Sequence, residues 1–293
     1  MPIRKSDAYT RARRNDLSLA EWKIRVDLAA AHQLFHQKGW TDGINTHLSA
    51  RSAENPDHFY LKPHEMMFHQ VTASDLVKVD LDGKLVDPDG DTVNLAGALI
   101  HSAVLAVRPD MNCVLHHHTE AGIAVSSLEV GLLPMSQHSL QFHGRMSYHE
   151  YETPLDPEER ANLQRDIGKN NAMLMRNHGV LVGGPSVAIA FASCDKLEVA
   201  CRAQLLAMQT GAQIHLPPKD VQDQTAAMYK GALGGQADTV EWNGWLTWPR
   251  VWPTSPNSGC ACAPVWQWRP TPFARPGRMT ANSGWVLPKL CRP

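Results

Sequence analysis

Predicted helices and short apolar strands alternate along residues 17 to about 235, and this alternation restricts the possible folds more than any other feature. The first helix begins with a capping box, Ser18-x-x-Glu21, and its apolar face ends at Gly39. Interleaved helices and strands favour an α/β fold in which helices cover both faces of one sheet. Further helices are expected over 95–107, after Thr119, from Asp156-Pro157-Glu158-Glu159 and over 186–210.

The stretch 112–119, NCVLHHHT, carries the clearest chemical signal. An apolar run leads into three histidines, and successive side chains of a strand point to opposite faces of the sheet. His116 and His118 should therefore share one face, while His117 should point to the other and serve a structural role. Two imidazoles on one face can chelate a divalent metal, although a histidine-rich strand end is more often plain polar surface.

A third histidine, His178, lies in AMLMRNHGVLVGG between two short apolar runs that we predict to be buried strands. Three histidines with an open fourth position suit a catalytic metal, because substrate or water must still reach the ion. A histidine at such a corner is equally often a hydrogen-bonded turn residue. The residues alone leave both interpretations open.

Composition excludes several classes of partner. The net charge of −1 gives no electrostatic reason to bind nucleic acid or an anionic membrane. No apolar run approaches the roughly 18 residues of a membrane span, and the first 16 residues lack the apolar segment of a signal peptide. We therefore expect a cytoplasmic protein without nucleic-acid or membrane contacts. The cysteines fit neither a disulfide framework nor a CxxC metal site, so those within helices and strands should be free and buried.

The domain boundaries follow from a change in composition. Residues 1–16 read as a polar leader, 17–238 as one folded domain, and 239–293 as an unstructured tail that the fold does not need. Seven of nine tryptophans and nine of twenty prolines fall within 242–293, but no Asp or Glu does. Out-of-frame translation of a GC-rich gene would produce this composition, and an authentic interaction tail is the alternative. Cys260-x-Cys262 is too little for a metal site.

Four segments, VLHHHTEAGIAVSSLEVGLLPMS, MSYHEYE, LMRNHGVLVGG and KLEVACRAQLLAM, resemble the class II aldolase/adducin family and in particular its adducin-type branch. The resemblance runs from about residue 17 to 235. It implies a three-layer α/β/α sandwich with a mixed, mostly antiparallel central sheet. It also implies that the chain assembles into a homo-oligomer, namely a tetramer. In the aldolase members, two histidines of the HxH strand and one of the HG corner bind zinc. The resemblance therefore implies a zinc site formed by His116, His118 and His178.

The chain also departs from the family pattern. Sugar-phosphate aldolases of the family carry a glutamate, a metal ligand and acid/base, four residues before a helical histidine; counting back from His101, that position is Gly97. The two serines that hold substrate phosphate correspond to Leu95 and Ala96. A Gly-Asn pair that contacts phosphate corresponds to Thr46 and His47. These changes favour an unphosphorylated or acidic substrate over a sugar phosphate.

With a glycine in place of the glutamate, another group must move the proton. The catalytic tyrosine of the family, which acts across a subunit boundary, falls on or near His138, and an imidazole titrates near neutrality. Glu120 is the second candidate, although its place in the first turn of a helix also fits a simple dipole interaction. Other residues that could line the site are Tyr148, His149 and Tyr151, with Arg51 and Arg176 as anchors for a substrate carboxylate.

Two functional hypotheses remain. The first is a metal-dependent lyase that acts on a small hydroxy-carbonyl or hydroxy-acid compound through a zinc-stabilised enediolate, with no organic cofactor. The second is a non-catalytic adducin-like module for oligomerisation or protein binding, which Gly97 favours. The fold alone does not distinguish them.

Overall fold

The computed structural model describes residues 17–86, 91–153, 155–156, 158–231 and 236–246, so the predicted leader and most of the predicted tail lie outside the described residues. A seven-stranded sheet has the order β3-β2-β1-β4-β7-β6-β5. Neighbouring strands are antiparallel except for the parallel pair β5 and β6, which confirms the mixed, mostly antiparallel sheet. The strands are β1 (His47–Arg51), β2 (His58–Leu61), β3 (Val77–Asp80), β4 (Cys113–His117), β5 (Met146–His149), β6 (Ala172–Met175) and β7 (Gly179–Gly184).

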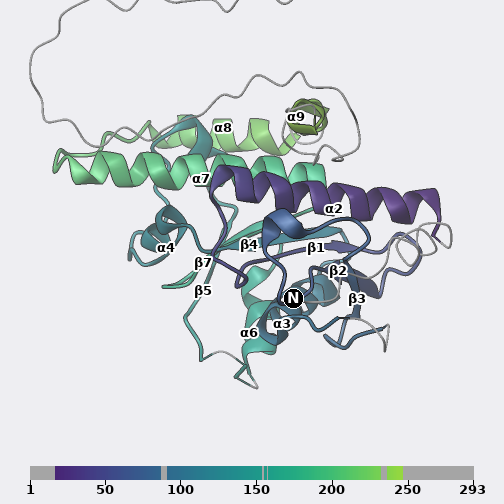
Figure 1. The fold of residues 1–293 in the computed structure, drawn as a ribbon. Coiled ribbons are helices and arrows are strands. Elements are labelled where there is room, and N and C mark those ends of the chain that lie inside the picture. Colours follow the sequence, from purple (N-terminus) through teal and green to yellow (C-terminus); the bar gives the residue numbers. More distant parts are fainter. Residues whose placement is uncertain (1–16, 87–90, 154, 157, 232–235, 247–293) are drawn as a thin grey trace, which may run out of the picture. The chain divides into compact units, whose positions relative to one another are not determined.

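Helices cover both faces of the sheet, as the alternation predicted (Figure 1). On one face lie α2 and α7, with α8 and α9 beyond them; on the other lie α3 and α6. Among the described residues, no helix combines the length and the apolar character that crossing a membrane would require. The helices are α2 (Leu19–Lys38), the short 3₁₀ helix η1 (Phe68–Gln70), α3 (Leu95–Val107), α4 (Glu120–Ser126), α5 (Gln137–Leu140), α6 (Glu159–Ile167), α7 (Val187–Gln209), α8 (Lys219–Gly231) and α9 (Gln236–Leu246).

Successive side chains of β4 point to opposite faces of the sheet. Leu115 belongs to the apolar core under α2 and α7, whereas Val114 belongs to the core under α3 and α6. His117 follows the same alternation as Leu115: its ring stacks on that of Trp40 at 5.8 Å between centroids and is fully buried. His117 is thus a packing residue on the face away from His116, as its position in the strand predicted.

The cap of α2 differs from the predicted capping box. The Ser18 hydroxyl accepts a hydrogen bond from the backbone N–H of Glu21 at 3.2 Å, but the Glu21 carboxylate does not return to Ser18. Instead it accepts hydrogen bonds from the Ser52 hydroxyl and the Ala53 N–H, both at 2.6 Å, and from Tyr60. Burial by itself would raise the pKa of the Glu21 carboxyl, but these hydrogen bonds outweigh it and the pKa is lowered. Glu21 therefore fixes α2 to the β1–β2 turn.

The predicted domain boundary at residue 239 falls inside a helix and is corrected. The helix α9 continues to Leu246, and the Trp242 side chain is only 3% exposed. Its ring packs edge-on against that of Phe191 in α7, with 5.5 Å between centroids. The ammonium of Lys38 lies 4.1 Å from the centre of the Trp245 ring. Composition alone placed these tryptophans in the tail, whereas apolar burial makes them part of the folded unit.

Candidate metal centre

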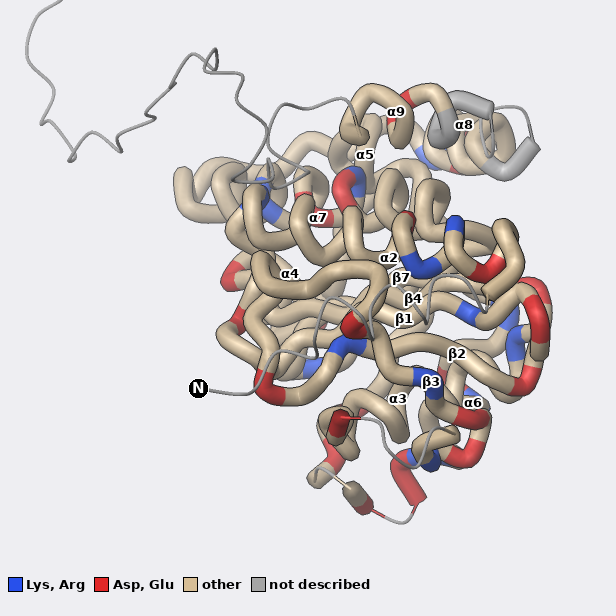
Figure 2. The backbone as a smooth tube through the Cα atoms, turned by 45° about the vertical axis from the view of Figure 1, so that its right-hand side comes forward, with Lys and Arg blue, Asp and Glu red and all other residues tan. Residues whose placement is uncertain are grey.

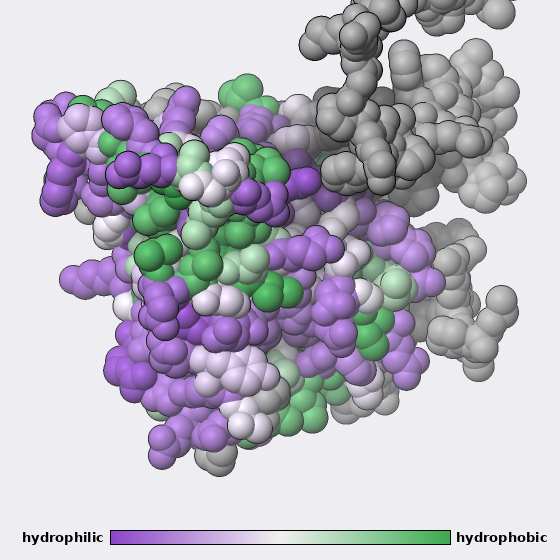
Figure 3. Space-filling view, turned by 90° about the vertical axis from the view of Figure 1, so that its left-hand side faces the viewer, coloured by the Kyte–Doolittle hydropathy of each residue, from purple (hydrophilic) through white to green (hydrophobic). Residues whose placement is uncertain are grey.

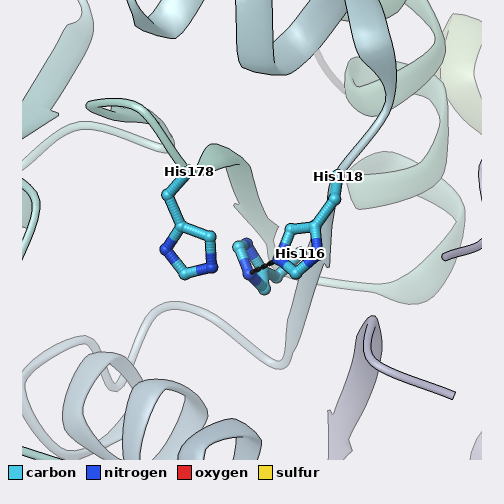
Figure 4. Close-up of side chains that lie close together, drawn as sticks. All are labelled: His116, His118 and His178. Atoms are coloured by element: carbon cyan, nitrogen blue, oxygen red, sulfur yellow. Dashed lines mark hydrogen bonds between the residues drawn. The ribbon is translucent and has the colours of Figure 1, made fainter. Parts of the chain in front are cut away.

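The sheet brings the three predicted histidines together. His116 and His118 come from the end of β4, and His178 comes from the turn between β6 and β7 (Figure 4). The turn places Asn177 in the left-handed region, with φ +57°, where asparagine is among the better tolerated residues. A Cβ at Gly179 would lie only 2.4 Å from the backbone oxygen of His117. A glycine is therefore needed for β7 to approach β4 this closely.

The imidazoles of His116, His118 and His178 form one compact group. Each offers one nitrogen, and these atoms all lie within 4.8 Å of one another. The Nε2 atoms of His116 and His118 are 2.9 Å apart. In the described part of the chain, this is the one cluster of three or more His, Cys, Asp or Glu side chains with a geometry that could hold a metal ion.

Hydrogen bonds at the opposite ring nitrogens fix the tautomers of two of these histidines. Nδ1 of His116 lies 3.0 Å from the carbonyl oxygen of Val180, and Nδ1 of His118 lies 3.1 Å from a carboxylate oxygen of Asp42. A carbonyl and a carboxylate only accept hydrogen bonds, so each Nδ1 must donate. In neutral rings the Nε2 atoms then direct lone pairs at each other, which is unfavourable unless a cation lies between them. Histidine ligands of metals are held by their second nitrogen in this way.

Burial favours the neutral rings that a metal requires. It lowers the pKa of His116 well below its usual value, and the neighbouring His178 and His118 lower it further. Burial and the charge of His118 lower the pKa of His178 to about 4. Neutral imidazoles with their lone pairs free are the form that binds a divalent ion, so the donor set fits such an ion.

A pocket of about 200 Å³ opens beside the three histidines. Its volume is below the roughly 300 to 1,000 Å³ of drug-sized ligand sites, so it suits a small compound. Acidic residues gather in the segment between β5 and α6, which appears in red in Figure 2. The further polar residues that line the pocket include Asn45, His47, His149, Glu152, Glu159 and Arg176.

The remaining sequence candidates occupy different positions. His138 in α5 and Glu120 in the exposed first turn of α4 do not line this pocket, so their catalytic roles stay predictions. His149 and Tyr151 line it, whereas Tyr148 does not.

Neither predicted carboxylate anchor has a free guanidinium. Arg51 is buried and donates to the carbonyls of Met111 at 3.2 Å and Leu105 at 2.8 Å, which corrects its predicted role. Arg176 reaches the pocket, but its guanidinium donates to the carbonyl of Leu128 and lies 4.6 Å from the Tyr148 ring centre. Arg176 therefore stabilises the loop that follows α4.

The sequence did not reveal a histidine–carboxylate pair in the pocket wall. Nδ1 of His149 lies 2.8 Å from an Asp166 carboxylate oxygen, and the His149 side chain is 3% exposed. Nearby Glu159 is buried too; burial raises the pKa of its carboxyl, while its hydrogen bond from Leu155 and the charge of His149 act in the opposite direction. Asp166 comes from α6 and His149 from β5, so no local spacing marks the pair. His149 itself was marked only as part of a strand that could line the site.

Comparisons with known proteins agree with this geometry. The family profile "Class II Aldolase and Adducin N-terminal domain" matches residues 26–205. A protein of Pseudomonas aeruginosa named "Putative aldolase class 2 protein" is 44% identical over 242 residues, which cover 80% of this chain and 90% of that protein. Alpha-adducin of Rattus norvegicus is 41% identical over 186 residues, which cover 62% of this chain but only 25% of the adducin.

Two solved structures share the fold. A crystal structure of an aldolase II superfamily protein from Pseudomonas syringae has a TM-score of 0.77 and 44% identity, covering 80% of this chain and 95% of that one. The L-fuculose 1-phosphate aldolase of Glaciozyma antarctica PI12 has a TM-score of 0.67 and 28% identity, covering 81% and 93%. Since the profile spans more than half of the chain and the histidine cluster lies inside it, the chain belongs to the class II aldolase and adducin N-terminal domain family.

Proposed function

We propose that the chain is a metal-dependent lyase of the class II aldolase type, acting on a small hydroxy-carbonyl compound, and that its metal is zinc. One observation carries the proposal: three imidazoles converge at the edge of a pocket, and two of them are oriented by acceptors at Nδ1. Three nitrogen ligands with an open fourth position are typical of catalytic zinc. When bound, the ion would supply Lewis-acid polarisation of a substrate carbonyl.

We assign proton transfer to His149. Its Nδ1 donates to Asp166, so its Nε2 is the nitrogen available to a molecule in the pocket. A carboxylate that holds an imidazole in one tautomer is a recurring arrangement for an acid/base histidine. His138 and Glu120 remain candidates for an assembled oligomer, because the tyrosine of the family to which His138 corresponds acts across a subunit boundary.

The charges around the pocket favour an uncharged substrate. Glu150, Glu152 and Glu159 line it, and Arg176, a basic residue in the same wall, is already bound to backbone carbonyls. An anionic group that the metal ion does not itself bind would meet repulsion from these carboxylates. Leu95 and Ala96 offer no side-chain donors for phosphate. Of the two substrate classes left by the sequence, an unphosphorylated hydroxy-carbonyl compound is therefore favoured over an acid.

An exposed apolar patch supports assembly into a homo-oligomer. Figure 3 shows this patch on the side of the molecule that carries α4 and the end of α7. Val130 and Leu206 are 57% and 66% exposed, and the Gln204 side chain, which donates to the Gly131 carbonyl at 2.8 Å, joins their two segments. Exposed apolar patches mark interaction surfaces. We propose that a second copy of the chain covers this apolar patch.

The alternative function is an adducin-like binding module without catalysis. The glycine at position 97 and the 41% identity with alpha-adducin favour it. The retained histidine cluster and its oriented tautomers favour the enzyme.

A chelator experiment separates the two functions. Zinc-loaded protein is screened against small aldoses, ketoses and hydroxy acids, each with and without its phosphorylated counterpart, before and after treatment with a chelator. The lyase predicts chelator-sensitive turnover of an uncharged hydroxy-carbonyl compound that phosphate does not improve. Absence of turnover on every compound, by a protein that holds its metal, would favour the binding module.

A further inference from the structure

His47 carries a buried imidazole with two unpartnered nitrogens. The residue opens β1 directly opposite His116 of β4, and the two rings stack with 6.1 Å between centroids and 17° between planes. Its side chain lines the pocket beside the three histidines but is only 6% exposed. Neither Nδ1 nor Nε2 has a hydrogen-bond partner among the described residues. Buried polar atoms almost always have partners. The His117 ring in the core also lacks them, but the His47 ring lines the pocket, so it points to a ligand there.

The conformation of His47 depends on Gly97. A Cβ at position 97 would lie 2.6 Å from Cγ and Cδ2 of the His47 ring and 2.8 Å from its Nε2. Real Cβ atoms essentially never come within 3.0 Å of another group. The imidazole thus occupies the space in which any side chain at position 97 would begin. At this position the sugar-phosphate aldolases that the sequence resembles carry glutamate.

The surroundings of the ring are polar but offer it no partner. The Thr46 hydroxyl and Nε2 of His101 are also buried without partners among the described residues. The other nitrogen of His101 is engaged by the Ser49 hydroxyl at 2.6 Å. The Lys62 ammonium donates a hydrogen bond to the Ile44 carbonyl at 3.0 Å, which fixes the segment that leads into β1. The His47 ring is therefore positioned at the pocket wall by packing, and neither of its nitrogens makes a hydrogen bond to a described residue.

We propose that His47 is a substrate-contacting residue that binds a hydroxyl group of the hydroxy-carbonyl compound, in the space that Gly97 leaves open beside the three-histidine centre. A neutral imidazole offers a donor at one nitrogen and an acceptor at the other, and a hydroxyl group can pair with either nitrogen because it both donates and accepts. A phosphate dianion only accepts hydrogen bonds, so it can pair with the protonated nitrogen alone. His47 therefore suits a hydroxyl group in either tautomer. This inference rests on the proposed metal-dependent function.

A pair of hydroxamates that differ by one hydroxyl group tests the assignment. Glycolohydroxamate and acetohydroxamate both chelate a divalent metal, and only the first carries the additional hydroxyl. Dissociation constants are measured by titrating the cobalt-substituted protein and following its visible absorption, with metal content determined on each sample. Wild type should prefer glycolohydroxamate by at least about 10-fold, since a site built to bind a hydroxyl rejects an analogue that lacks it.

Two variants and one control complete the design. His47→Leu should abolish the preference while leaving acetohydroxamate affinity within about threefold of wild type. Gly97→Ala should also lower the preference, because the added methyl group displaces the His47 ring without removing it. This variant replaces His47→Leu in the test if His47→Leu folds poorly. His143→Leu, which loses a surface histidine bonded to Asp223, should retain the wild-type preference.

The outcomes separate this inference from the proposed function. A wild type that binds metal but shows no preference, or a preference that survives in both His47→Leu and Gly97→Ala, would overturn the role of His47 alone. A wild type that binds no metal would overturn the proposed function and this inference with it.

Discussion

His149 is the pocket histidine outside the three-histidine cluster whose ring is oriented by a carboxylate. General acid-base groups contribute about 10²- to 10⁴-fold in rate, so His149→Gln should lower turnover of the identified substrate by about that factor without loss of metal. Steady-state kinetics and metal analysis on the same preparation check this. His138→Ala and Glu120→Gln are the comparison variants. If either of these loses turnover while His149→Gln keeps it, the assignment to His149 is wrong.

The buried carboxylate of Glu21 predicts a specific acid sensitivity. Its folded-state pKa is lowered from 4.5, so its contribution to stability is present above that value and is lost as the pH falls through the folded-state pKa. At pH 7, Glu21→Gln should reduce the free energy of unfolding by about 2 kcal/mol, because hydrogen bonds to a charged group are lost. Urea unfolding at several pH values should show the two proteins converging below pH 4.5. A constant difference down to pH 3 would refute the assignment.

The residues whose convergence the sequence predicted are those marked by strand period or local motif. His116 and His118 were paired because alternate residues of a strand share a face, and the HG corner marked His178. Asp42, Asp166 and the fit of His47 against Gly97 follow from tertiary packing, which brings together residues that are 17 to 76 positions apart. Nothing in the local pattern marks such partners.

Among the secondary-structure elements, α9 shows where composition misleads. The loss of acids and of periodicity after residue 242 predicted a dispensable tail, yet Trp242 is buried against α7. Helices α2, α3 and α7 were predicted close to their observed bounds because their caps and apolar stripes are local signals. The helix α9 has no apolar period of its own and packs through its tryptophans, so it can be recognised only when the position of α7 is known.

Truncation tests this correction. A chain ending at Leu246 should melt within a few degrees of full length, whereas one ending at residue 235 should melt about 10 °C lower. Loss of a buried tryptophan typically costs about 3 to 5 kcal/mol, and 1 kcal/mol shifts the melting temperature of a domain this size by about 2 to 4 °C. Trp242→Ala in the longer chain should reproduce most of the decrease. Equal melting temperatures for the two chains would restore the original boundary.

At the scale of the whole molecule, residue patterns predicted neither the strand order nor the exposed apolar patch. The order β3-β2-β1-β4-β7-β6-β5 was not predicted, and the family resemblance implied only a mixed, mostly antiparallel sheet. The sheet places the three-histidine cluster where β4 meets the β6–β7 turn. The apolar patch joins a loop after α4 to the end of α7, so it exists only in the folded chain.

The patch gives a prediction about assembly. Leu206→Asp together with Val130→Asp should yield a smaller species than wild type, because a charge on each apolar surface opposes its burial. Light scattering after size-exclusion chromatography measures the mass, and circular dichroism verifies the fold. Lys219→Asp, which changes an exposed residue of α8, is the control. An unchanged mass for the double variant would remove this surface from consideration.

The central claim is that the three histidines hold one divalent ion, and elemental analysis of the purified protein tests it most directly. Wild type loaded with zinc and then desalted should retain about one ion per chain, and His118→Ala should retain almost none. His117→Phe, which keeps an aromatic ring in the core on the other face of the same strand, should retain the wild-type amount. Zinc retained by His118→Ala, or lost equally by His117→Phe, would contradict the claim.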